Sequence, residues 1–208
     1  MNTLKTHWLR LIVHVSVWIP LAVIILDAFT KHLSADPIRE IILRTGKTAL
    51  TLLILSLACT PANSLLGFRQ ALKVRRALGL YAFMYVAFHF FMFTVVDYGL
   101  DVSLLRDALF EKPYALVGFA AGVILLPIAI TSTKGWMKRL GQLWKRIHQG
   151  VYIAVLFVII HFVWLVKLDV REPLTYGAIV ITLLVLRLHP IRHLITHLRN
   201  RTSPAHWQ

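Results

Sequence analysis

Long apolar runs without charge constrain this chain more than any other feature of its sequence. Of its 208 residues, 58% are hydrophobic and only 15% are charged, and the charged residues fall in short segments between the runs. A helix needs about 20 apolar residues to cross the hydrocarbon core of a bilayer. A soluble domain of this size needs far more polar surface. The sequence therefore predicts an integral membrane protein with almost no soluble part.

The runs are continuous rather than alternating, which favours helices over the strands of a membrane barrel. We expect an all-α bundle of six transmembrane helices forming a single domain over residues 1–208, with a loose polar tail at 199–208. Pro20 predicts a kink in the first helix, and Thr60-Pro61 predicts the end of the second. No clear internal repeat is apparent. The predicted spans cover about 8–26, 48–66, 77–96, 113–133, 147–166 and 173–189.

The distribution of charge predicts the orientation. If the N-terminus is cytoplasmic, 15 of the 23 Lys and Arg residues fall in cytoplasmic segments, and all nine acidic residues fall in the outer ones. Cytoplasmic segments of membrane proteins carry the excess of Lys and Arg. We therefore expect both termini in the cytoplasm. The net charge of +14 is then a topological signal, not a sign of nucleic-acid binding.

Two histidines lie deep in different predicted spans. His89 is thirteen residues beyond Arg76, and His161 is fifteen beyond Arg146, which places them about 20 and 22 Å from those entry charges. An ionisable side chain inside a membrane needs a partner there. Paired imidazoles at one depth are the usual axial ligands of haem b. The alternative is that each histidine only hydrogen-bonds a facing helix.

Two more histidines lie near the cytoplasmic surface, His148 two residues beyond Arg146 and His14 four beyond Arg10. They predict a second, inner haem as an alternative to a single outer one. Each could also be an interfacial or packing residue. Arg75 and Arg76 are candidates to bind haem propionates or a flavin phosphate, unless they only set topology.

One further pattern favours packing over chemistry. Gly118 and Gly122 form a GxxxG spacing, which favours close contact between membrane helices. No sequence motif marks a catalytic residue.

An ordered set of short segments resembles a known family over most of the chain, roughly residues 36–187. No single segment is specific, but their order is. The segments are Thr60-Pro61, Arg75-Arg76-Ala77-Leu78-Gly79-Leu80, Tyr85, His89, Asp97, Lys112-Pro113-Tyr114, Thr131-Ser132, Leu140-Gly141, Trp144, His148, Tyr152 and His161. They resemble the haem-binding membrane subunit of the periplasmic methionine-sulfoxide reductase system, within the ferric-reductase-like transmembrane group.

The resemblance implies a haem b cytochrome of the bacterial inner membrane that passes electrons to a periplasmic molybdopterin enzyme. That enzyme itself reduces methionine sulfoxide in damaged proteins. It implies quinol or a cytoplasmic flavin reductase as donor, and FMN as a further cofactor. By position, His89, His148 and His161 correspond to the functional histidines of that family.

One departure from the wider group matters. Ferric reductases carry two histidines on the third helix, but thirteen residues before His89 stands Arg76. Either the protein holds one haem, or an inner haem uses a substitute ligand, for which His14 is the candidate. Two other functions remain open at this point: a stand-alone ferric or quinone reductase, and a small transporter without redox chemistry.

Overall fold

The computed structural model describes residues 2–166 and 169–188, with side chains described from residue 8 onward. These residues form helices joined by short turns, with no strand among them. The helices are α1 (Asn2–Ser16), α2 (Ile19–Phe29), α3 (Pro37–Leu66), α4 (Arg69–Phe91), the π-helical turn η1 (Met92–Asp97), α5 (Val102–Glu111), α6 (Pro113–Ile130), α7 (Lys134–Leu140), α8 (Gln142–Leu165) and α9 (Arg171–Val185).

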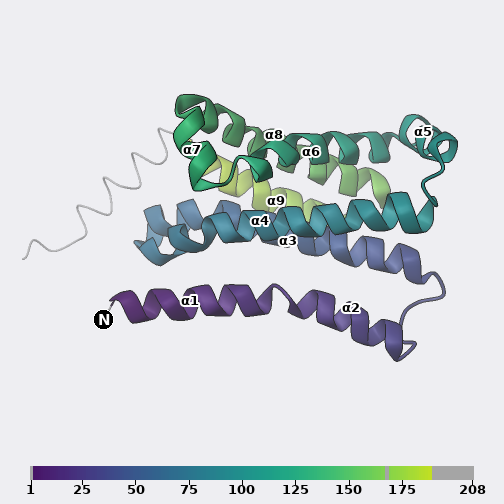
Figure 1. Cartoon of the computed structure of the whole chain (residues 1–208), viewed down its shortest axis with the longest axis horizontal. Coiled ribbons are helices and arrows are strands. Elements are labelled where there is room, and N and C mark those ends of the chain that lie inside the picture. The colour runs from purple at the N-terminus through teal and green to yellow at the C-terminus, as the bar shows by residue number, and fades with distance from the viewer. Residues whose placement is uncertain (1, 167–168, 189–208) are drawn as a thin grey trace, which may run out of the picture.

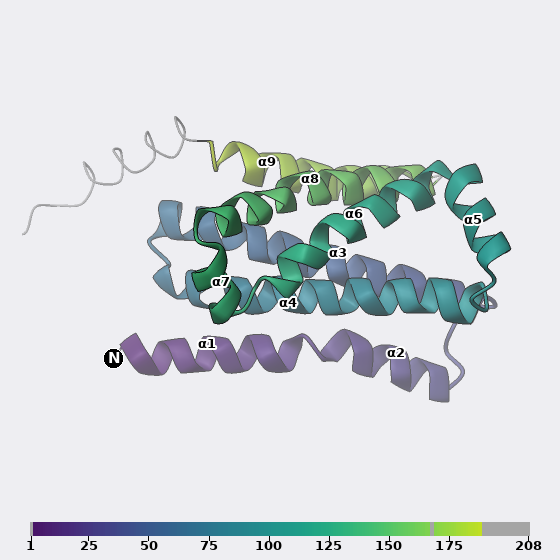
Figure 2. The same cartoon turned by 45° about the horizontal axis from the view of Figure 1, so that its top comes forward.

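The long helices run side by side along one axis (Figure 1). α3 packs against α4, and α6 packs against α8, so that two antiparallel pairs form the centre of the bundle. α9 covers α8 and α3, while α1 and α2 form a separate layer below α3 and α4 (Figure 2). The short helices α5 and α7 lie at opposite ends of the bundle.

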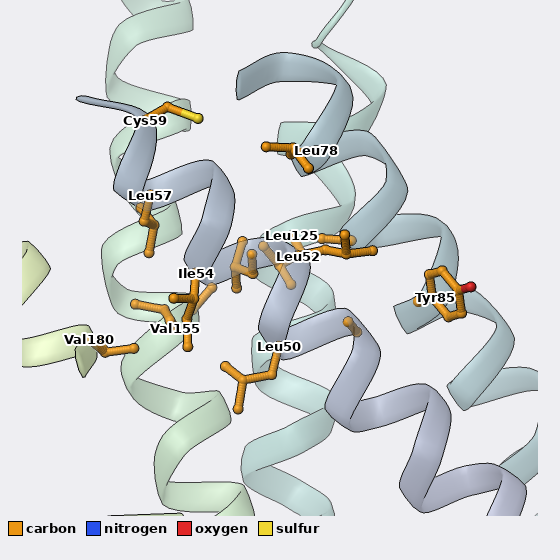
Figure 3. Close-up of a cluster of buried hydrophobic side chains, with 14 of the residues drawn as sticks. Leu50, Leu52, Ile54, Leu57, Cys59, Leu78, Tyr85, Leu125, Val155 and Val180 are labelled. Carbon is orange, nitrogen blue, oxygen red and sulfur yellow. The ribbon is translucent and has the colours of Figure 1, made fainter. Parts of the chain in front are cut away.

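Apolar side chains of three helices fill the centre. Ile54 and Leu57 of α3 meet Val155 of α8 and Val180 of α9 (Figure 3). Val155 and Val180 have no exposed surface, and Leu57 is 2% exposed. Many other apolar side chains are exposed on the outer faces of the bundle, as expected where lipid replaces water as the solvent.

The first predicted span is interrupted. The α-helix stops at Ser16 and resumes at Ile19, with Pro20 in the first turn of α2. Proline has no N–H, so the carbonyl one turn earlier loses its helical donor, and the predicted kink appears just before the proline. The Tyr85 hydroxyl of α4 donates to the Val17 carbonyl at 2.7 Å in this break. The α1–α2 layer is thus attached to α4 where its own helix is interrupted.

The helix that contains the second predicted span, α3, extends beyond that span at its N-terminal end. α3 begins at Pro37, where Asp36 accepts from the Arg39 amide, and ends at Gly67, which adopts the left-handed conformation (φ 67°). Its charged first turns remain helical because Arg44 forms ion pairs with Asp27 and Glu40. The helix therefore begins before the predicted span, at residue 37 in place of residue 48.

The predicted helix end at Thr60-Pro61 was wrong, because α3 continues through Pro61 to Leu66, where the predicted span ends. Pro61 deprives the Leu57 carbonyl of its helical donor. The Arg187 guanidinium, beyond the end of α9, supplies a replacement at 2.5 Å and also donates to Thr60 Oγ1 at 3.2 Å. The Arg187 side chain therefore donates to the Leu57 carbonyl, which Pro61 leaves without a helical donor.

Five described helical stretches are long and apolar enough to cross a membrane: Trp8–Phe29, Pro37–Leu66, Arg69–Asp97, Pro113–Ile130 and Gln142–Leu165. They correspond to the first five predicted spans. The sixth corresponds to α9, which has 15 residues and is shorter than a full span. Residue 189 and the predicted tail at 199–208 lie outside the described residues. In the part of the chain that the structure describes, the protein is thus all-helical with several membrane-spanning helices, and the count of six stays a prediction.

Candidate functional site

His89 of α4 and His161 of α8 lie at one level, which agrees with their matched depth, and their rings are close to each other. Their ring centroids are 6.3 Å apart and their planes are perpendicular. Both side chains are partly buried. We call these two residues the histidine pair. The pair joins the α3–α4 half of the bundle to the α6–α8 half.

Each imidazole of the pair is held by a backbone carbonyl of a neighbouring helix. Nδ1 of His89 lies 2.8 Å from the Ile42 carbonyl of α3, and Nδ1 of His161 lies 2.7 Å from the Tyr114 carbonyl of α6. A carbonyl oxygen only accepts, so each Nδ1 carries the proton and donates. The neutral ring then keeps an unprotonated Nε2, the form that binds iron.

The spacing of the pair fits a shared iron atom. Two imidazoles that bind one metal at about 2 Å each, with half a ring at either end, have centroids about 6 Å apart. No group of three or more His, Cys, Asp or Glu side chains that could hold a bare metal ion lies in the described segments. Two axial nitrogens are the protein ligands that a six-coordinate haem needs, because the macrocycle supplies the other four. The pair therefore fits haem.

His148 lies elsewhere on α8, nearer the end where α7 lies. Its Nδ1 is 3.0 Å from the carbonyl of Trp144, one turn earlier, and its Nε2 is 3.3 Å from Ser132 Oγ. The Trp144 indole stacks on the imidazole with centroids 3.9 Å apart. His148 thus shows the same Nδ1-to-carbonyl arrangement as the histidine pair, with a weakly held Nε2.

His14 has different surroundings. Its Nδ1 lies 2.7 Å from the Tyr81 hydroxyl of α4, and the side chain is exposed. His14 and His148 therefore have separate partners on separate helices, and the structure does not bring them together as a pair. The contact with Tyr81 attaches α1 to α4, one turn away from the bond that Tyr85 makes.

The two arginines also differ in their contacts. Arg75 donates to Thr60 Oγ1 at 3.3 Å, the same oxygen that accepts from Arg187. Arg76 lines a hollow of about 270 Å³ between α1 and α4, together with Arg10, His14 and Lys73. Arg75 and Arg76 have no acidic residue near them in the sequence. All nine acidic residues fall in segments 27–40, 97–111 and 169–172.

The residues that hold the imidazoles were missed by sequence reasoning. Ile42 and Tyr114 act through main-chain oxygens, which every residue has, so their identity gives no signal. One regularity was available: Ile42 precedes His89 by 47 residues, and Tyr114 precedes His161 by the same 47. The two halves of the site are thus built in the same way, although no clear repeat is apparent in the sequence.

Comparison with known proteins agrees with this architecture. Residues 45–159 match the family of the ferric reductase like transmembrane component. Curated relatives named protein-methionine-sulfoxide reductase heme-binding subunit MsrQ include one from Xanthomonas axonopodis pv. citri, 40% identical over 84% of this chain and 83% of its own. Another, from Xanthomonas campestris pv. campestris, is 44% identical over 73% of this chain and 70% of its own.

A more distant relative of the same name, from Caulobacter vibrioides, is 36% identical over 81% of both chains. No solved structure matches significantly. The matched region runs from within α3 to within α8 and includes His89 and His148, and the alignments with relatives extend over most of the chain. The chain therefore belongs to the ferric-reductase-like transmembrane family and, within it, to the MsrQ family.

Proposed function

We propose that this protein is a haem b electron-transfer subunit of the bacterial inner membrane. It would pass electrons from quinol, or from a cytoplasmic flavin reductase, to a periplasmic molybdopterin enzyme that reduces methionine sulfoxide in oxidised proteins. The relatives' names support both the haem and the sulfoxide reductase system. The sulfoxide reduction itself belongs to the partner, since no catalytic motif is found in this sequence.

The histidine pair is the single observation that carries the proposal. Its two imidazoles come from different helices, lie 6.3 Å apart, and each have Nδ1 committed to a carbonyl. Haem bound between them would supply one-electron redox chemistry. The chain contributes the two ligands, fixes their tautomers, and surrounds the site with apolar helices that exclude water. These contributions are what a membrane electron carrier requires of its protein.

We propose His148 as a ligand in a second, inner redox site. Its Nδ1-to-carbonyl bond and the stacked Trp144 support this role. Arg75 and Arg76 would provide positive charge at that end for haem propionates or a flavin phosphate. FMN enters on the family resemblance alone. His14 is the weakest candidate, because binding iron would mean giving up the Tyr81 hydroxyl.

The orientation follows from charge. We propose six spans with both termini in the cytoplasm, so that the histidine pair lies in the outer half of the membrane. Electrons would then enter at the basic end and leave at the acidic end. The α5 segment and the loops around it would face the periplasmic partner.

Haem analysis of the purified protein tests the proposal. We expect the protein in detergent to contain b-type haem with a low-spin spectrum, and both His89→Ala and His161→Ala to lose it. His32→Ala is a matched control, because His32 contacts Thr30 at the surface. Purified protein that lacks a Soret band after haem supplementation would refute the proposal and favour a transporter.

A second measurement identifies the electron acceptor. The dithionite-reduced protein, after removal of reductant, should be reoxidised rapidly by the purified periplasmic sulfoxide reductase in the presence of methionine sulfoxide. Reoxidation only by ferric chelates or quinones would instead indicate a stand-alone reductase.

A further inference from the structure

Two glycines lie directly against the histidine pair. A Cβ atom added to Gly118 of α6 would lie 2.6 Å from His161 Nδ1 and 2.9 Å from Cε1. A Cβ added to Gly46 of α3 would lie 3.1 Å from His89 Nδ1 and 3.2 Å from Cε1. The distances at Gly118 would be a clash, and those at Gly46 would be a contact tighter than ordinary packing. Each imidazole thus occupies the volume that a side chain on the neighbouring helix would need.

The positions of these glycines explain how the imidazoles reach the carbonyls. Gly46 follows Ile42 by four residues, and Gly118 follows Tyr114 by four, which is about one helical turn. The Cα–Cβ bond of a helical residue tilts toward the N-terminus of its helix, over the preceding turn. Any side chain at position 46 or 118 would therefore cover the carbonyl that accepts from the histidine. Glycine leaves that oxygen open.

Other helical glycines lack this relation. Gly122, one turn after Gly118 on the same helix, has nothing within 4 Å of its added Cβ, and Gly79 has only Ser56 Oγ at 3.4 Å. The two glycines of the GxxxG spacing thus have different surroundings. Gly118 faces an imidazole, while Gly122 faces open space.

We propose that Gly118 and Gly46 are positioning residues for the two axial ligands. They allow each imidazole to lie on a helix backbone, where the carbonyl fixes Nδ1 as donor and leaves Nε2 unprotonated, so that it would be able to bind haem iron. Gly118 is the tighter of the two, so His161 depends more on its glycine than His89 does. This inference rests on the proposed haem function.

Three alanine variants of the full-length protein test it. Gly118→Ala forces the His161 ring to move, so we expect loss of most of the low-spin haem signal and a five-coordinate fraction that binds carbon monoxide when reduced. Gly46→Ala should show the same change in a smaller fraction. Gly122→Ala should match the wild type, because its Cβ meets nothing. Alanine is also the better helix former, so the control should not lose stability.

The readouts are the low-spin signal in electron paramagnetic resonance and the carbon monoxide difference spectrum, both per mole of protein. Gly118→Ala with a wild-type spectrum and no carbon monoxide binding would refute the inference. So would an equal change in Gly122→Ala. If Gly118→Ala does not accumulate in membranes, Gly46→Ala decides: a partial carbon monoxide-binding fraction supports the inference, and a wild-type spectrum refutes it.

The same variants distinguish a failure of the proposed haem function from a failure of the positioning role of the glycines. If the wild-type protein itself lacks low-spin haem, or if His161→Ala keeps it, the pair is not the ligand set. If the wild type has it and both histidine variants lose it, but the glycine variants do not differ from the control, only the positioning role is wrong.

Discussion

Replacing Arg187 by methionine tests how α3 continues past Pro61. Methionine has a similar length and no charge, so the change removes the guanidinium and keeps much of the packing. The side chain makes three hydrogen bonds: to the Leu57 carbonyl at 2.5 Å, to Tyr152 Oη at 3.0 Å and to Thr60 Oγ1 at 3.2 Å. All three join Arg187 to another helix, two of them to α3 and one to α8.

Hydrogen bonds between membrane helices contribute about 0.6 kcal/mol each on average. Three of them give about 2 kcal/mol, and leaving a buried carbonyl unpaired costs about 1–3 kcal/mol. The methionine avoids the desolvation of a charge, which offsets part of this loss. We therefore expect Arg187→Met to lower the free energy of unfolding by about 2 kcal/mol.

Pro61→Ala supplies the matched background. Its N–H can donate to the Leu57 carbonyl, so the arginine is no longer needed there. In that background we expect Arg187→Met to cost only about 1 kcal/mol, which is a coupling energy of about 1 kcal/mol in the double-mutant cycle. Unfolding by sodium dodecyl sulfate in mixed micelles, followed by far-ultraviolet circular dichroism, measures all four proteins.

The result that refutes this reasoning is an equal cost of Arg187→Met in both backgrounds. The guanidinium would then stabilise the bundle without replacing the donor that proline lacks. Tyr152→Phe separates the remaining contribution, because it removes only one of the three acceptors.

Three further predictions concern other contacts. His14→Ala should leave the haem-to-protein ratio unchanged, because Tyr81 is the partner of His14; a fall in that ratio would make His14 a ligand after all. His148→Phe keeps the stacking on Trp144 but removes both ring nitrogens, so we expect less haem per protein with the spectrum of the histidine pair retained, and an unchanged ratio would exclude His148. The carboxylate of Asp101, the N-cap of α5, accepts from a serine hydroxyl and two amides, and these bonds hold its pKa below the usual value. Its contribution to stability is therefore present above a pH of about 3.9 and lost as the pH falls through the lowered pKa; thermal unfolding against pH should show a weaker acid-side decline for Asp101→Ala.

Most of the helices, and the common depth of His89 and His161, were predictable from the sequence. Apolar length and charge spacing fix where each helix crosses, and a common depth follows from the rise per residue. The contact itself needed one more condition, the proximity of α4 and α8, which hydropathy does not specify. The structure supplies it through two packed helix pairs.

The errors have a common physical cause: partners remote in sequence. The first turns of α3 look too polar for a span, but Arg44 is paired with Asp27 from the preceding helix. Pro61 looks like a helix end, but Arg187 restores the missing bond. Main-chain acceptors such as the Ile42 carbonyl are equally invisible, since they leave no trace in residue type. The sequence signs of these acceptors are Gly46 and Gly118, one turn later, and the equal 47-residue spacing to each histidine.

The carbonyl, glycine and histidine have equal spacings in the two halves of the site, which relates the two halves to each other. α3 and α4 form one antiparallel hairpin, α6 and α8 form another, and both hairpins start at the same end of the bundle (Figure 1). This is the arrangement of a twofold dimer with its axis along the bundle, in which each subunit gives one histidine to a shared centre. A single chain can have different residues at equivalent positions of the two hairpins, which a dimer of identical subunits cannot. Thirteen residues before the histidine of the pair, the first hairpin has Arg76 and the second has His148.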